Sequence, residues 1–148
     1  MDHIPEFEIT TYRFDDKQYR EWTFPYDYHY LYILENGKDA YVGETNDIIK
    51  RSKAHHGKTD PCYPFRFRRI HVITGRDITA TPAKHYENLL IKLMRIDRRF
   101  HIRNTDPGVR TFYAAKNEFE LGFDLLWVKL AERGLVRRTK FSAILNSS

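Results

Sequence analysis

Short apolar and aromatic segments in the first half of the chain predict a small sheet. Residues 30–34 and 69–73 are rich in β-branched and aromatic side chains, and residues 39–43 contain a similar, shorter run. Such composition favours strands. Asn36 and Gly37 lie between the first two segments, and this dipeptide suits the positive φ angles of a tight hairpin turn. We therefore expect a mainly antiparallel three-stranded sheet that begins with a hairpin.

Two later segments have apolar residues at helical spacing. The first follows Thr79 or Thr81, either of which can cap a helix, and has Pro82 in its first turn. The second spans about residues 117–133 and ends at Gly134. Helical spacing predicts a buried face on each helix. The predicted inward positions are Leu89, Leu90, Leu93, Met94 and Ile96 in the first, and Phe119, Phe123, Leu126, Trp127 and Leu130 in the second.

A third, shorter helix is expected between the hairpin and the last predicted strand. Thr45 or Asn46 can cap it, it starts near Asp47, and it ends by Gly57. Helices packed against a short antiparallel sheet define an α+β fold. The sequence therefore predicts one small sheet flanked by helices, with an extra C-terminal helix.

The two ends of the chain differ from this central region. Residues 1–28 are polar and aromatic without a sustained period, so we expect an N-terminal arm there, with one short helix over residues 10–20. The folded domain is expected over residues 29–135. Residues 136–148 begin with basic side chains and are expected to form a basic tail or a truncated linker.

Composition narrows the class of protein. A chain of 148 residues with 41% hydrophobic residues fits one globular domain. The net charge of +5 favours a polyanionic partner, although many enzymes carry such a surplus. The single cysteine, Cys62, cannot form an internal disulfide, and no apolar run approaches the ~20 residues of a membrane span. We therefore expect a cytoplasmic protein.

A set of polar side chains is expected to meet at one end of the hairpin. Tyr30 and Tyr32 share one face of their strand, because strand side chains alternate, and Tyr41 lies on the partner strand. Arg51 and His55 are one turn apart on the following helix. Phosphodiester hydrolysis needs an activated water and neutralised phosphoryl charge, which a metal ion, an arginine and a proton acceptor can supply. Glu87, on the next helix, is the candidate metal ligand.

These residues resemble the signature of the GIY-YIG nucleases. The resemblance is carried by residues 30–32 and 41–43, then by Arg51 and His55, and covers about residues 30–104. Tyr30 replaces the first glycine of the signature and Val42 replaces an isoleucine, and neither departure removes a chemical group. The resemblance implies an endonuclease that cleaves DNA, with RNA as an alternative substrate.

The resemblance also implies roles for single residues. One of Tyr32 and Tyr41 would be the general base, and Arg51 would stabilise the transition state. His55 would assist, and Glu87, in the segment around residues 83–91, would hold one Mg²⁺ or Mn²⁺ ion. Asn104 resembles the asparagine that closes the family core.

Beyond this core the chain resembles GIY-YIG modules fused ahead of helicase-like ATPases. That likeness rests on Phe112 and Tyr113, the helix around Trp127, and Gly134 with Leu135. It implies an excised N-terminal domain that is fused to, or works with, a helicase-like ATPase.

Other residues leave two interpretations open. Arg66, Arg68 and Arg69 alternate with phenylalanines and could either line a nucleic-acid channel or protect a solvated strand edge. Tyr30 and Asn104 are further candidate nucleic-acid contacts, and their alternatives are a core aromatic and a turn residue. His55, His56 and Cys62 lack a fourth zinc ligand at a standard spacing. For the whole chain, the alternative to a nuclease is a non-catalytic nucleic-acid-binding or interaction module.

Overall fold

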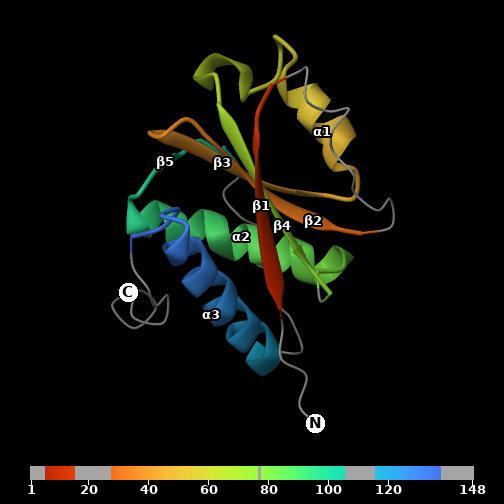
Figure 1. Cartoon of the computed structure of the whole chain (residues 1–148), viewed down its shortest axis with the longest axis vertical. Coiled ribbons are helices and arrows are strands. Elements are labelled where there is room, and N and C mark those ends of the chain that lie inside the picture. Colours follow the sequence, from red (N-terminus) through yellow and green to blue (C-terminus); the bar gives the residue numbers. More distant parts are fainter. Residues whose placement is uncertain (1–5, 16–27, 77, 106–115, 138–148) are drawn as a thin grey trace.

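The computed structural model describes residues 6–15, 28–76, 78–105 and 116–137. Figure 1 shows a sheet with helices on both of its faces. The strands are β1 (Phe7–Arg13), β2 (Tyr30–Glu35), β3 (Asp39–Thr45), β4 (Arg69–Gly75) and β5 (His101–Ile102). The helices are α1 (Ile48–His55), α2 (Ala80–Asp97) and α3 (Lys116–Glu132), with a short 3-10 helix, η2 (Tyr63–Phe65), before β4.

The strands form one mixed sheet in the order β1-β4-β2-β3-β5. All neighbouring strands are antiparallel except β3 and β5, which are parallel. The α+β class and the three expected strands are confirmed as β2, β3 and β4. The expected size of the sheet was wrong, because β1 and β5 extend it to five strands.

The N-terminal segment contributes the edge strand β1. Phe7 and Ile9 are buried while Glu8 and Thr10 are exposed, which is the alternation of a strand with one covered face. β1 pairs with β4 over its whole length, from Phe7 opposite Gly75 to Arg13 opposite Arg69. The helix expected over residues 10–20 is therefore wrong up to Arg13, and residues 16–27 lie outside the described part of the chain.

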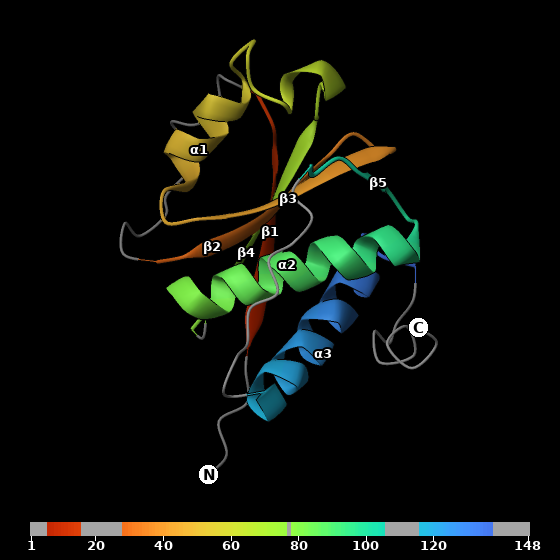
Figure 2. The same cartoon turned by 180° about the vertical axis from the view of Figure 1, so that it is seen from behind.

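The sheet separates two hydrophobic clusters. Figures 1 and 2 show α2 and α3 on one face and α1 on the other. Leu31 and Ile33 of β2 belong to the cluster that includes residues of α2 and α3, whereas Tyr30, Tyr32 and Leu34 belong to the opposite cluster with Ile48 of α1. The two tyrosines therefore share the α1 face, as their spacing predicts.

The helices agree with their predicted inward faces at most positions. Leu90, Leu93 and Met94 of α2 are buried, and so are Phe123, Leu126, Trp127 and Leu130 of α3. Ile96 is 39% exposed, so its predicted inward position was wrong. The Phe119 side chain lies outside the described residues. None of the described helices is long and apolar enough to cross a membrane.

The ends of the helices follow local chemistry. α1 is capped by Asp47, whose side chain accepts a hydrogen bond from the Lys50 amide at 3.1 Å, and not by Thr45 or Asn46 as expected. Thr79 occupies the N-cap of α2. After α3, Gly134 has φ of +73°, which favours glycine and ends the helix where predicted.

A buried carboxylate ties three strands together at one end of the sheet. Glu35 accepts hydrogen bonds from Arg69 at 2.7 and 3.0 Å, and it lies 2.8 Å from Nε2 of His71. His71 continues to the Thr11 hydroxyl of β1 at 2.7 Å. Burial opposes ionisation of Glu35, but the hydrogen bonds from His71, Arg69 and the Gly37 amide outweigh it and lower its pKa to about 2.

The Glu35 network predicts a pH-dependent stability. A carboxylate with a lowered pKa stabilises the fold above its ordinary pKa of 4.5, and this contribution is lost as the pH falls towards 2. We expect Glu35→Gln to lower the free energy of unfolding by about 3 kcal/mol at pH 7, and the difference from wild type to shrink between pH 5 and 2. Urea unfolding across this pH range measures it. Glu132→Gln, at an exposed position of α3, is the control, and a pH-independent difference for Glu35→Gln would contradict the assignment.

Candidate active site

The hairpin of β2 and β3 places the Tyr32 ring directly over Gly43. The two residues are partners in the β2–β3 register. A Cβ atom built on Gly43 would lie 2.2 Å from Cζ of Tyr32, so no larger residue fits beneath this ring. Tyr41 lies beside it, with ring centroids 6.4 Å apart. Glycine at position 43 thus leaves room on β3 for the hydroxyl end of the buried Tyr32 ring.

The Tyr32 hydroxyl begins a chain of hydrogen bonds through α1. Its oxygen lies 2.8 Å from Nε2 of His55, and Nδ1 of His55 lies 3.0 Å from Oδ1 of Asp60. The same Asp60 oxygen accepts a hydrogen bond from the Cys62 amide at 2.8 Å. An ionised carboxylate can only accept, so Asp60 selects the tautomer with a proton on Nδ1. Nε2 of neutral His55 is then the acceptor for the Tyr32 proton.

The surroundings of these hydrogen-bonded residues determine their protonation states. Burial raises the pKa of Tyr32 well above 10 and that of Tyr41 to about 12, so both phenols are neutral at pH 7. Burial also lowers the pKa of His55, and Asp60 opposes this shift. Despite its own burial, Asp60 has a lowered pKa because His55 and the Cys62 amide bond to it. The resting chain is a neutral tyrosine, a neutral imidazole and a carboxylate.

Arg51 supplies positive charge one turn before His55. It is exposed, and its guanidinium makes no ion pair or side-chain hydrogen bond with any residue that the structure describes. Its charge lowers the pKa of Tyr32 and of Tyr41, so it lies within electrostatic reach of both phenols. An exposed guanidinium beside two phenols is free to bind an anionic group.

Glu87 approaches the phenols from α2. Its side chain is 11% exposed, and its negative charge raises the pKa of Tyr32 and of Tyr41. Burial raises the pKa of Glu87, and a hydrogen bond from Lys84 at 2.9 Å opposes the shift. The nearby Glu44 carboxylate raises it as well. Glu87 is thus a sheltered carboxylate that already has a cationic group at bonding distance.

The chemistry of Glu87 fits a hard divalent cation. Mg²⁺ is bound through one or two carboxylates and keeps several waters. The Lys84 ammonium is paired with the Glu87 carboxylate, which shows that a positive charge is favourable at this position. A metal ion bound there would replace Lys84 as the partner of Glu87. Glu87 is therefore the residue that would hold Mg²⁺ or Mn²⁺.

A second group of possible metal ligands lies within the hydrogen-bonded chain. Ligand atoms of His55, Asp60 and Cys62 lie within 4.8 Å of one another. Both ring nitrogens of His55 already have partners, however. Burial, and then the neighbouring Asp60, raise the pKa of the Cys62 thiol in the metal-free protein. These contacts favour a proton-holding network over a metal centre.

Three residues predicted to contact nucleic acid are instead buried or hydrogen-bonded within the fold. Tyr30 is buried in the α1-side cluster. Asn104 uses its amide as a strand would, accepting from the Val42 amide at 3.0 Å and donating to the Val42 carbonyl at 2.7 Å. Arg69 is paired with Glu35. Their observed contacts are structural, and those of Asn104 hold β3 beside the phenols.

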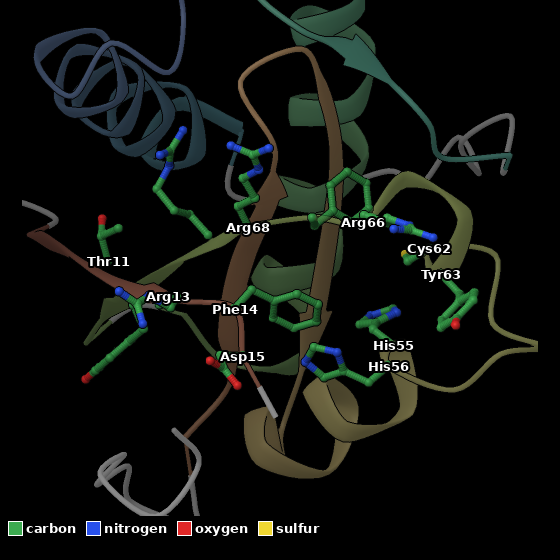
Figure 3. Close-up of a pocket in the computed structure, with 13 residues that line it drawn as sticks. Thr11, Arg13, Phe14, Asp15, His55, His56, Cys62, Tyr63, Arg66 and Arg68 are labelled. Carbon is green, nitrogen blue, oxygen red and sulfur yellow. The ribbon is translucent and has the colours of Figure 1, made fainter. Parts of the chain in front are cut away.

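Arg66 and Arg68 differ from these three residues. Both are exposed, and neither side chain has an ion pair or hydrogen bond with a described residue. They lie in the loop between α1 and β4, on a groove whose wall includes His55. Figure 3 shows Arg66 near Cys62 and His55, and Arg68 on the other side of Phe14. Of the residues predicted to contact nucleic acid, these two are available to do so.

Sequence reasoning missed Asp60, which lies in the loop between α1 and η2. The signal available was a carboxylate five residues after the histidine of α1, just past the end of the helix. Such spacing lets the chain turn back and present the carboxylate to the imidazole. Without the loop conformation, the same spacing also fits a solvated turn residue.

Comparison of the chain with protein-family models, with curated proteins and with solved structures found no match.

The close approach of Tyr32 to Gly43 predicts the effect of a single methyl group. We expect Gly43→Ala to displace the Tyr32 ring, break its bond to His55 and destabilise the fold by about 1–3 kcal/mol, as overpacking does. Urea unfolding and the ¹⁵N chemical shifts of the His55 ring would measure both effects. Gly57→Ala is the control, since its Cβ meets only the Ala54 carbonyl oxygen, at 3.2 Å. Unchanged stability and unchanged His55 shifts in Gly43→Ala would refute this packing argument.

Proposed function

We propose that this protein is a metal-dependent endonuclease that hydrolyses phosphodiester bonds in DNA. The observation that carries the proposal is the hydrogen-bonded chain from Tyr32 through His55 to Asp60, with Arg51 and Glu87 in electrostatic reach of its phenol. The resemblance of residues 30–104 to GIY-YIG nucleases supports it independently. The separate likeness beyond this core, at Phe112 and Tyr113, the helix around Trp127, and Gly134 with Leu135, is the one support for the further proposal that the domain works with a helicase-like ATPase.

In the proposed reaction, the hydrogen-bonded residues Tyr32, His55 and Asp60 accept a proton. Tyr32 takes a proton from the attacking water while its own hydroxyl proton passes to Nε2 of His55. The imidazolium that forms is stabilised by Asp60, which holds the other ring nitrogen. Tyr32 is the better candidate base of the two phenols, because His55 accepts its proton, whereas no described side chain is hydrogen-bonded to the Tyr41 hydroxyl.

The charges around the phenols suit a phosphodiester. Arg51 presents a planar, permanently charged donor set that matches two phosphoryl oxygens and stabilises the charge of the transition state. Glu87 would hold the divalent cation, which supplies neutralisation of phosphate charge and lowers the pKa of bound water. Both groups sit at the margin of a buried, uncharged pair of phenols, where the substrate would bring in negative charge.

Nicking of supercoiled plasmid in Mg²⁺ or Mn²⁺ tests the proposal. We expect Arg51→Ala and Glu87→Gln each to lower the rate at least about 100-fold, as the loss of a transition-state charge partner does. Lys50→Ala on the same helix and Glu132→Gln on α3 are matched controls and should stay near the wild-type rate. Equal background nicking by wild type and the two site variants would reject catalysis. DNA binding without any nicking would instead favour the non-catalytic binding module.

The role of Asp60 predicts a change in the pH profile. Activity requires neutral His55, so the rate rises as the pH passes the His55 pKa. Asp60 raises that pKa, and its removal leaves burial to lower it further. We expect Asp60→Asn to move the acidic limb of kcat/KM to lower pH and to reduce the maximum about 100-fold. Asp47→Asn, which removes a carboxylate but keeps a good helix cap, is the control. An unshifted acidic limb would exclude this role for Asp60.

A further inference from the structure

An arginine-rich groove lies next to the hydrogen-bonded chain and is not used by the proposed reaction. It has a volume of about 840 Å³ and is formed by the end of β1, the loop after α1 and the start of β4. His55 and Cys62 line it, so its inner wall is shared with the candidate active site. Figure 3 shows Arg13, Arg66 and Arg68 placed around Phe14.

The groove is strongly basic at its rim. Arg13, Arg66 and Arg68 are exposed, and none of their side chains is paired with a described residue. Arg69 also lines the groove but is bound to Glu35, and Asp15 is the one carboxylate among the described residues that line the groove. Three unpaired guanidinium groups around one concavity repel each other unless an anion joins them. The ligand class is therefore polyanionic.

The backbone fixes the positions of these arginines. The Arg68 amide donates to the Glu35 carbonyl at 2.9 Å, and the Arg68 carbonyl accepts from the Phe14 amide at 2.7 Å. Arg66 has φ of +49°, a left-handed conformation that is costly for a residue with a side chain. Such conformations persist where the surrounding structure enforces them, and they occur often at binding sites.

Aromatic side chains complete the groove. Phe14 stacks on His56 with ring centroids 4.1 Å apart and forms part of its floor. Tyr63 stands at the other side and is 42% exposed. Basic side chains that follow a backbone, together with an exposed ring on which a base can stack, are the usual components of a site for unpaired nucleic acid. The groove volume lies in the range of pockets for drug-sized molecules, roughly 300–1,000 Å³, and so suits one or two nucleotides.

We propose that this groove binds an unpaired nucleic-acid strand, with phosphates on Arg13, Arg66 and Arg68 and a base stacked on Tyr63. The inference rests on the proposed nuclease function and deepens it. Because His55 lines the groove and belongs to the candidate active site, the bond to be cut would lie beside a single-stranded segment. The preferred substrate is then a branched or overhanging nucleic acid rather than a continuous duplex.

Binding by the full chain carrying Glu87→Gln tests the inference without requiring turnover. The probes are a fluorescent 12-nucleotide single strand, the same sequence as RNA, and the matched DNA duplex, followed by anisotropy at several salt concentrations. We expect the single strand to bind at least tenfold more tightly than the duplex. Arg66→Gln and Arg68→Gln should each reduce the salt slope by about 0.7, and Tyr63→Ala should weaken single-strand binding about tenfold.

Arg76→Gln is the matched control, since Arg76 is exposed, likewise unpaired among the described residues, and follows the opposite end of β4. It should leave single-strand binding unchanged. The RNA probe shows which nucleic acid the groove accepts, and tighter binding of either single strand than of duplex supports the inference. Equal binding of single strand and duplex, or an Arg76→Gln loss as large as that of Arg66→Gln, would overturn it.

Cleavage separates this inference from the proposed function. If wild type cuts a continuous duplex as fast as one with a single-stranded flap, the strand preference fails while the nuclease function stands. If wild type cuts neither, while Glu87→Gln binds single strands through Arg66, Arg68 and Tyr63, the nuclease function fails and the binding site stands.

Discussion

The contact between the Tyr32 ring and the bare Gly43 backbone determines the geometry of the whole site. A phenol in the middle of a sheet can reach a helix above that sheet only if nothing beneath or beside it competes for the space. Gly43 provides that space, and the register of β2 and β3 keeps the two residues opposite each other. The Tyr32 hydroxyl therefore meets His55 at 2.8 Å, and α1 is held at the distance that this bond requires.

Charge is distributed around this contact in a consistent way. The buried groups are neutral at rest, because burial raises the phenol pKa values and lowers that of His55. The guanidinium of Arg51 and the carboxylates of Glu87 and Asp60 lie around them and bias which way a proton can move. A neutral interior with charges at its margin gives an incoming phosphate a favourable place to bind and gives a proton one acceptor.

Much of the fold could be predicted from the sequence, because its elements have strong local signals. The Asn36-Gly37 turn with flanking β-branched residues identified β2 and β3, and helical periodicity identified α2 and α3. β1 was not predicted, because a seven-residue edge strand with charged and polar residues on one side has only a weak hydrophobic period. β5 escaped because its two residues form a strand only through their pairing with β3. Neither strand is specified locally.

The site was predictable to a similar extent. The residues with a helix or strand position, such as Arg51 and His55, could be placed relative to one another from periodicity alone. Asp60 and Arg13 depend on where a loop and an edge strand come to rest, so no spacing rule reveals them. Conversely, the polar groups of Asn104 and Arg69 are engaged by Val42 and Glu35, partners that lie 62 and 34 residues away in the sequence.

A crystal structure of the protein soaked in Mn²⁺ most directly tests whether Glu87 binds the metal ion while Tyr32, His55 and Asp60 carry protons. We predict an anomalous peak at the Glu87 carboxylate, with Lys84 displaced and His55 still bonded to Tyr32 and Asp60. A manganese ion bound instead by His55, Asp60 and Cys62, with the bond from Tyr32 to His55 broken, would contradict the claim that these hydrogen-bonded residues carry protons.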